Sequence, residues 1–231
     1  MTIADNISAI RGHIQEAVSR RATLGAPGPV KLVAVTKNQG LAEMREALSA
    51  GIGAVGENRI QEAAGKYAEL GDLPEWHLIG HLQTNKVHLA VPIFHLIHSV
   101  DSERLASEIN RVAGKIGKRQ NILLQVNVAD EETKFGIDSD QAIDLAWKIS
   151  GLEHLCLRGL MTIAPFYDDK EKTRPIFRKL YEIFSALRKA APPNTFIDSL
   201  SMGMTNDYVV AVEEGANIVR VGTGIFGARK Y

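Results

Sequence analysis

The regular alternation of short apolar segments with longer amphipathic ones constrains the fold of this sequence more than any other feature. The short segments are rich in β-branched residues, and we predict strands at 31–37, 54–58, 76–80, 94–100, 121–128, 157–163, 196–202 and 217–224. Helix-like segments lie between them, at 41–50, 59–70, 84–90, 102–117, 138–150, 171–191 and 206–214. Strands that alternate with helices indicate an α/β fold with a parallel sheet, and eight of them favour a closed (β/α)8 TIM barrel over an open sheet.

A further amphipathic segment precedes the first predicted strand. Ile3, Ile7, Ile10, Ile14 and Val18 recur at helical spacing before a Gly- and Pro-rich break. The chain ends seven residues after the last predicted strand, which leaves almost no room for an eighth barrel helix. We therefore expect this extra N-terminal helix to fill the vacant place in the outer ring, and residues 1–231 to form a single barrel domain.

Composition narrows the range of partners and compartments. Lys and Arg together number 27, as do Asp and Glu, so no basic surface for nucleic acid is expected. The one cysteine, Cys156, lies in an apolar segment and is expected to be a small buried side chain. The N-terminus lacks the apolar run of a signal peptide, and no stretch is long enough to span a bilayer. We expect a cytoplasmic protein without a membrane segment.

Lys37 closes the first predicted strand. In TIM barrels the residues at the carboxyl ends of the strands surround the active site, so this ammonium group should lie at the mouth of the barrel. Burial there would lower the pKa of the amine and supply the neutral nucleophile that Schiff-base chemistry requires. The alternative is a lysine that extends from the strand end to solvent.

The last two strand ends resemble a phosphate-binding site. Ser201, Gly203 and Thr205 follow the seventh strand, while Gly222, Thr223 and Gly224 follow the eighth. Glycine amides and hydroxyl groups are suitable donors to an anion, and barrels often bind phosphate at this pair of strands. The alternative is two tight turns that need glycine for backbone reasons only.

Other polar residues near the strand ends are less specific. Arg220 lies in an apolar strand and needs a partner, either a ligand atom or an inward carboxylate such as Glu57. His77 and His81 lack two further convergent ligands, so we predict no metal site. The charged loop that contains Asp130, Glu131, Glu132 and Lys134 is either a solvated rim or a cover over the mouth, and the sequence leaves the role of residues 129–136 open.

These features recur together in one known family. The matching stretches are LVAVTK (32–37), GENRIQEA (56–63), WHLIGHLQTNK (76–86), IHSVDS (97–102), LLQVNVADEETKFGI (123–137), LRGLMTI (157–163), LSMGMTNDY (200–208) and VRVGTGIFGAR (219–229). With these motifs the chain resembles the pyridoxal-phosphate homeostasis protein family, small barrel relatives of alanine racemase that lack its second domain. The resemblance implies a fold like the N-terminal domain of alanine racemase.

The resemblance also implies a cofactor, pyridoxal 5'-phosphate, and a role for each matching residue. Lys37 corresponds to the lysine that forms the Schiff base, Asn58 and Met161 to residues beside the cofactor ring, and Arg220 to the arginine that faces the pyridine nitrogen. Ser201, Thr205, Gly222 and Thr223 correspond to the residues that bind the phosphate. Thr205 and Asn206 stand where the family often has Ser and Asp, and the first change keeps the hydroxyl.

Arg220 limits the chemistry that such a cofactor could perform. Arginine stays protonated and is a poor proton donor to a pyridine, so the cofactor would be a weak electron sink. A racemase also needs a second base, which in alanine racemase comes from the domain absent here. We therefore expect a non-enzymatic protein of cofactor homeostasis, monomeric, that exchanges pyridoxal phosphate with amino acids or apo-enzymes. The alternatives are an amino-acid racemase or lyase, and an aldolase-like barrel in which Lys37 attacks a sugar phosphate.

Overall fold

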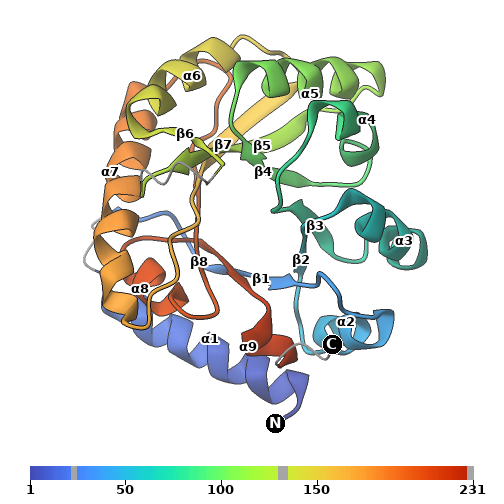
Figure 1. Cartoon of the computed structure of the whole chain (residues 1–231), viewed down its shortest axis with the longest axis vertical. Helices are drawn as coiled ribbons and strands as arrows, with labels where there is room; N and C mark the ends of the chain where they lie inside the picture. Colours follow the sequence, from blue (N-terminus) through green and yellow to red (C-terminus); the bar gives the residue numbers. More distant parts are fainter. Residues whose placement is uncertain (22–24, 130–134, 228–231) are drawn as a thin grey trace.

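Eight parallel strands close into a barrel in the computed structural model, which describes residues 1–21, 25–129 and 135–227. The strands are β1 (Lys31–Val35), β2 (Ala54–Glu57), β3 (Glu75–Leu78), β4 (Leu96–Val100), β5 (Gln120–Asn127), β7 (Leu155–Met161), β8 (Ser199–Met204) and β9 (Ile218–Val221). Each pairs in parallel with the next in this order, and β9 returns to β1, so the ring is complete (Figure 1). The predicted (β/α)8 TIM barrel is confirmed.

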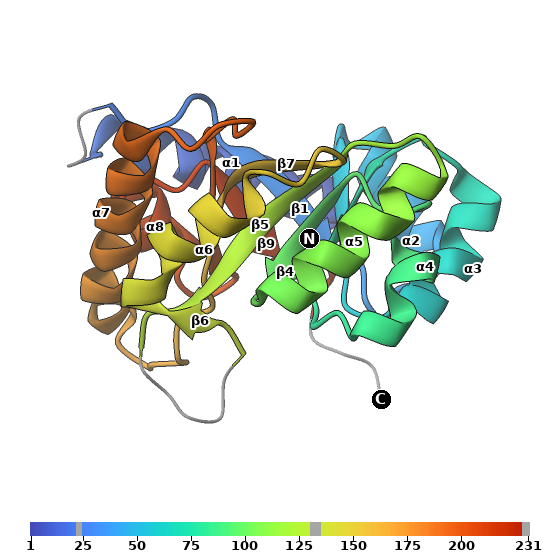
Figure 2. The same ribbon diagram turned by 90° about the horizontal axis from the view of Figure 1, so that it is seen from above.

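Helices surround this ring. They are α2 (Leu41–Ser49), α3 (Ile60–Leu70), α4 (Val87–Ala90), α5 (Glu103–Lys115), α6 (Ala142–Ile149), α7 (Arg174–Ala190), α8 (Tyr208–Glu213) and the short α9 (Thr223–Phe226). One predicted boundary is wrong, because Ile137–Asp138 forms a two-residue strand, β6, beside the end of β5. The helical segment therefore starts as a 3-10 turn at Ser139–Gln141, and β6 lies at the lower edge of the barrel in Figure 2.

The predicted N-terminal helix is α1 (Ile3–Ser19), and it occupies the expected place in the outer ring. Thr2 and Asp5 cap its first turn, each side chain accepting from the other's backbone N–H. The helix packs against α2, α8 and α9, so it lies where an eighth barrel helix would run (Figure 1). Its buried face ends at Ala17, whereas Val18, predicted on that face, is 40% exposed.

The core has two apolar regions. The larger lies between the barrel and its helices, and its largest fully buried side chains include Trp76, Phe94 and Phe177. The smaller fills the inside of the barrel and consists of Val33, Ala54, Leu96, Leu123, Met161 and Ile218. Buried polar side chains share the barrel interior with this second cluster, as the contacts of Arg220 show below.

Two further predictions from the sequence concern the burial of Cys156 and membrane-spanning segments. Cys156 is half-buried rather than buried, because it alternates along β7 with the buried Leu155 and Leu157, so that prediction is wrong. Among the helices that the structure describes, none is both long and apolar enough to cross a membrane.

Candidate functional site

Lys37 follows β1 at the carboxyl end of the barrel, in a short turn that three neighbouring side chains hold. The ammonium of Lys66 on α3 donates to the carbonyl of Thr36 at 2.7 Å, and the Thr36 hydroxyl donates to Glu57 at 2.6 Å. On the other side, the Asn38 N–H donates to Glu62 at 2.6 Å. Buried or half-buried groups therefore hold both residues that flank Lys37. This fixes the backbone position from which the half-buried Lys37 side chain extends.

The group behind this turn is a buried charge cluster of Lys66, Glu57 and Glu62. Lys66 Nζ lies 2.7 Å from Oε1 of each glutamate, and all three of its donors are used once the Thr36 carbonyl is counted. Burial raises the pKa of Glu57 despite hydrogen bonds from Lys66 and Thr36. Burial acts in the same direction on Glu62, but hydrogen bonds from Lys66 and Asn38 hold its pKa below the ordinary value.

The ends of β8 and β9 form a cradle of donors around one hydroxyl. Thr205 Oγ1 accepts from the backbone N–H groups of Gly222 at 3.4 Å and Gly224 at 3.3 Å, and from the Thr223 hydroxyl at 3.2 Å. These contacts are longer than the usual N–H···O distance of about 2.9 Å, so a stronger acceptor such as a phosphate oxygen can take the same donors. Asn6 holds the far end of this turn through the Ile225 carbonyl at 2.8 Å.

Gly203 allows the β8 turn to approach α8 closely enough to place Thr205. Its φ of 91° lies in the left-handed region, and a Cβ there would lie 2.5 Å from the Cβ of Ala211. Glycine is needed here for backbone reasons, and the cradle forms beside it. The backbone interpretation therefore holds for Gly203, and phosphate binding at this pair of turns stays a prediction.

Arg220 points into the barrel from β9, and its side chain is fixed by neutral oxygens. Its Nη1 donates to Ser201 Oγ at 2.5 Å and its Nη2 to the Thr162 carbonyl at 2.9 Å. Burial lowers the pKa of Arg220 to about 10, so the guanidinium stays charged at neutral pH. The alternative partner Glu57 is wrong, because that carboxylate pairs with Lys66.

The structure separates Ser201 from the other predicted phosphate residues. Its side chain is fully buried inside the barrel, where the hydroxyl contacts Arg220 and lies 3.0 Å from His98 Nδ1. Thr205, Gly222 and Thr223 do come together. The reason is the two-residue period of a strand, which turns Ser201 towards the barrel axis before the chain reaches the Gly203 turn.

Asn58 and Met161, the residues predicted to lie beside the ring, occupy different depths. Asn58 is half-buried just after β2, and its carbonyl lies so close to Gly80 that a Cβ there would be 2.4 Å away. Met161 is fully buried in the apolar cluster inside the barrel. The contacts of these two side chains do not test whether they would lie beside a cofactor ring.

The two histidines considered for a metal site lie in different surroundings. His77 is buried inside the barrel against His98, whereas His81 stacks on Phe135 with ring centroids 3.9 Å apart. No group of three or more metal-ligating side chains occurs within the described ranges. Asp130, Glu131, Glu132 and Lys134 lie outside the described residues.

Lys66 and His98 are the site residues that the sequence did not single out. Lys66 is hidden in an amphipathic helix, where a lysine is normally solvated, although its spacing of four from Glu62 does indicate an ion pair. His98 follows Leu96 by two residues in a strand, so the period of two places both on one face of the sheet. That signal shows a shared face but not that the face is the inner one.

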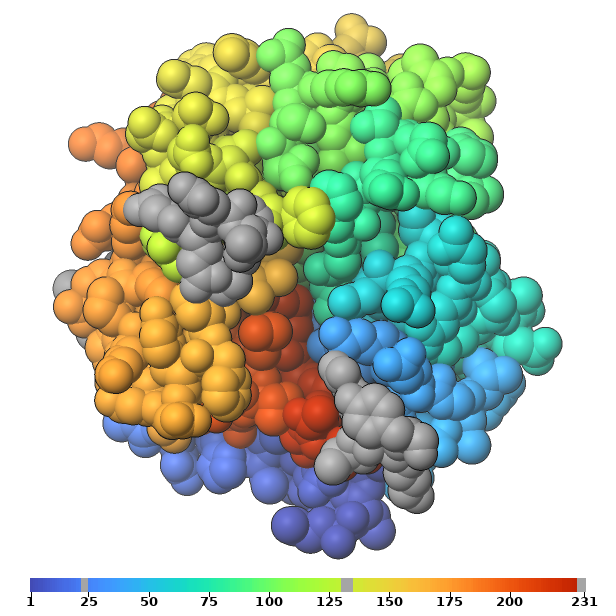
Figure 3. Space-filling view, in the orientation of Figure 1, coloured from blue at the N-terminus to red at the C-terminus, as the bar shows by residue number. Residues whose placement is uncertain are grey.

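Figure 3 shows the face of the molecule on which the segment around β1, in blue, meets the segments around β9, in red. The same two strands are paired in register, Val33 with Arg220 and Ala34 with Val221. A lysine after β1, a donor cradle after β8 and β9, and a buried guanidinium on β9 thus come from neighbouring strands of one barrel. Such a set combines a primary amine, which can act as a nucleophile, with several donors suited to an anion.

Comparisons with known proteins identify the family and the fold. Residues 4–230 match the family described as alanine racemase, N-terminal domain. A pyridoxal phosphate homeostasis protein from Pasteurella multocida is 40% identical over all of this chain and 99% of its own length. Another from Aquifex aeolicus is 41% identical, with both chains fully covered.

The chain belongs to the pyridoxal phosphate homeostasis protein family. A solved structure of another protein, PipY of Synechococcus elongatus with pyridoxal phosphate bound, superposes on this chain with a TM-score of 0.83 at 38% identity, covering 98% of this chain and all of that one. An alanine racemase of Clostridium difficile has a TM-score of 0.75 at 16% identity and spans 98% of this chain but 58% of its own, which reflects the shared fold alone.

Proposed function

We propose that this protein binds pyridoxal 5'-phosphate as a Schiff base on Lys37 and serves the homeostasis of the cofactor. The observation that carries the proposal is the convergence of Lys37, the Thr205 cradle and Arg220 at the mouth of one barrel. Membership of the family, and a relative with the cofactor bound, support the choice of cofactor. The Lys37 nitrogen would bond to the aldehyde carbon, and the aldehyde oxygen would leave as water.

Each predicted residue has a place in this proposal. The amides of Gly222 and Gly224 and the hydroxyls of Thr205 and Thr223 would bind the phosphate, since their present contacts are long. Asn58 would line the ring near its edge, and Met161 would lie beneath it, inside the barrel. Ser201 would act through Arg220 rather than on the phosphate, because its hydroxyl already contacts that guanidinium.

Arg220 supports a binding protein over an enzyme. The guanidinium keeps its proton at neutral pH and can only donate, so a pyridine nitrogen in front of it remains unprotonated. The bound cofactor, which supplies an electron sink to enzymes, would be a poor one here. Relatives are named homeostasis proteins, which is consistent with a carrier.

The cellular setting follows from the same proposal. We infer one barrel domain over residues 1–231, a monomer in the cytoplasm, that exchanges the cofactor with amino acids or delivers it to apo-enzymes. The proposed partners are therefore small molecules and other proteins, not nucleic acid, in keeping with the zero net charge.

The direct test is spectroscopic and chemical. The purified protein should be yellow with pyridoxal phosphate bound, and borohydride should fix the cofactor to one peptide that contains Lys37. Lys37→Ala should abolish the absorption band, whereas the exposed Lys148→Ala should retain it. A colourless wild-type protein that cannot be reconstituted would refute the proposal. Sustained racemisation of alanine or serine would instead identify an enzyme, and trapping of a sugar phosphate on Lys37 an aldolase.

A further inference from the structure

A chain of hydrogen bonds crosses the inside of the barrel from Arg220 to Glu75. Arg220 Nη1 lies 2.5 Å from Ser201 Oγ, and Ser201 Oγ lies 3.0 Å from His98 Nδ1. His98 Nε2 lies 2.9 Å from His77 Nδ1, and His77 Nε2 lies 3.3 Å from Glu75 Oε2. The three central side chains are at most 1% exposed, so water does not separate them from one another.

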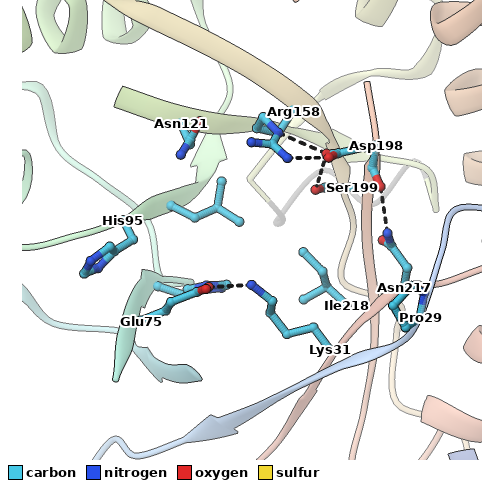
Figure 4. Close-up of a pocket in the computed structure, with 12 residues that line it drawn as sticks. Pro29, Lys31, Glu75, His95, Asn121, Arg158, Asp198, Ser199, Asn217 and Ile218 are labelled. Carbon is cyan, nitrogen blue, oxygen red and sulfur yellow. Dashed lines mark hydrogen bonds and ion pairs between the residues drawn. The ribbon is translucent and has the colours of Figure 1, made fainter. Parts of the chain in front are cut away.

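This hydrogen-bond chain joins the two ends of the barrel. Arg220 lies towards the carboxyl ends of the strands, near the candidate site, while Glu75 is the first residue of β3. Glu75 lines a cavity of about 390 Å³ at the amino end and forms an ion pair there with Lys31 (Figure 4). A second ion pair in this cavity, between Arg158 and Asp198, is not part of the chain.

The chemistry of the members fixes the direction of every bond. A guanidinium can only donate, so Ser201 accepts from Arg220 and uses its one hydroxyl proton towards His98 Nδ1. His98 is then neutral with its proton on Nε2, which donates to His77 Nδ1. His77 in turn carries its proton on Nε2 and donates to the Glu75 carboxylate. The reverse order would place a bare nitrogen of His77 against a carboxylate, which is repulsive.

The charges along the chain agree with this direction. Burial lowers the pKa of His77, and it lowers the pKa of His98 well below the ordinary value, so both imidazoles are neutral. The hydrogen bond from His77 is the main reason that the pKa of Glu75 falls to about 2, with the Lys31 ammonium adding to it. The other groups that act electrostatically on the two imidazoles are Lys31, Glu75, Arg220 and His95. A cation thus begins the chain and an anion ends it.

We propose that His98 and His77 are positioning residues for the cofactor ring, acting through Ser201 to fix the donor direction of Arg220. The inference rests on the proposed function, since the ring is what Arg220 would face. Ser201 is held as an acceptor only while His98 accepts its proton, and His98 keeps that tautomer only while His77 and Glu75 accept in turn. The orientation of the guanidinium at one end of the barrel therefore depends on a carboxylate at the other.

The first test needs no cofactor. Two-dimensional ¹⁵N–¹H NMR of the imidazoles in the apo-protein at neutral pH should show both His77 and His98 as neutral rings protonated on Nε2. A proton on Nδ1 of either ring, or an imidazolium, overturns the inference. Because this measurement is made on the empty protein, its outcome is independent of whether pyridoxal phosphate binds.

The second test is the effect of breaking the chain on the bound cofactor. His98→Leu keeps the bulk of the side chain but removes both hydrogen bonds, and it should weaken pyridoxal phosphate binding about tenfold and shift its absorption maximum. His95→Leu is the matched control, because His95 directly precedes β4, the strand that carries His98, and also accepts a hydrogen bond, from the Trp76 N–H, outside the hydrogen-bond chain. It should leave both readouts unchanged.

A second pair of variants guards against misfolding of His98→Leu. Ser201→Ala breaks the chain with a smaller change in volume, and Ser201→Thr keeps the hydroxyl and should restore the absorption maximum. A folded His98→Leu or Ser201→Ala protein with wild-type affinity and spectrum overturns the inference. Wild-type protein that shows the expected tautomers but never binds the cofactor refutes the proposed function and, with it, the positioning role.

Discussion

Lys66 offers the sharpest test of how the site is built, because it is a buried cation whose every donor is used. Its side chain is 10% exposed, and its two carboxylate partners, Glu57 and Glu62, are 0% and 24% exposed. Lys66→Met fills a similar volume but removes the charge. Glu57 then loses its cation, and its second oxygen, Oε2, already has no partner. The Thr36 carbonyl loses one donor as well and keeps the Gln39 N–H at 3.0 Å.

The expected cost follows from this burial. Removing one partner of a buried ion pair costs about 3–5 kcal/mol, since the other charge remains in a poorly solvated place. Glu57 can relieve part of this by taking up a proton, because burial already raises its pKa. We therefore expect Lys66→Met to lower the free energy of unfolding by about 3 kcal/mol, at the lower end of that range. The double variant Lys66→Met with Glu57→Gln should lose less than the sum of the two single variants.

Urea unfolding followed by tryptophan fluorescence measures this, since Trp76 is fully buried. The control is Lys148→Met on the exposed face of α6, which should change stability by no more than about 0.5 kcal/mol. Lys66→Met should also weaken cofactor binding, because the turn that carries Lys37 loses an anchor. A Lys66→Met protein as stable as the Lys148→Met control would show that the cluster is not a structural element and would refute the reasoning.

Three further predictions follow from single contacts. Thr205→Val removes a hydroxyl that would donate to the phosphate, and a titration should show about tenfold weaker binding of pyridoxal phosphate, while Thr205→Ser stays near wild type. Gly203→Ala should lower the free energy of unfolding by about 2 kcal/mol, because alanine is strained at the positive φ of this position. Gly12→Ala, on α1 where a Cβ would meet open space, should not lower it, and thermal unfolding measures both. Acid should destabilise the fold below about pH 6.5, because the unfolded chain protonates His77 and His98 where the folded barrel holds them neutral. The slope should reach about 1.4 kcal/mol per pH unit for each imidazole, and a pH series of urea midpoints that stays flat between pH 7 and 5 would contradict this.

Local chemistry made much of the fold and part of the site predictable. The βα alternation gave eight strands because a buried parallel strand requires a short apolar run and its helix an amphipathic one. The positions of Lys37, Thr205 and Gly222 just after the ends of strands were predictable for a related reason. In a barrel, the carboxyl ends of all strands lie at the same face, around the active site. A residue that follows a predicted strand can therefore be placed at that face from the sequence.

The sequence was less informative wherever the partner of a residue comes from a distant strand. β6 was not predicted, and its second residue, Asp138, was assigned to a helix. A two-residue strand becomes stable only when β5 lies beside it. Ser201 was grouped with the phosphate residues by proximity along the chain. Inside the barrel, however, its neighbours are Arg220 and His98, which are 19 and 103 residues away.

The sequence by itself therefore determined the barrel, the extra N-terminal helix and the residues at the strand ends, because each depends on short-range periodicity. The tertiary structure alone decided which face of each strand is inside. That choice buries Lys66 against Glu57 and aligns His77 with His98, since the closing of the ring sets the register between strands. A hydrogen-bonded chain across a barrel can exist only after that register is fixed.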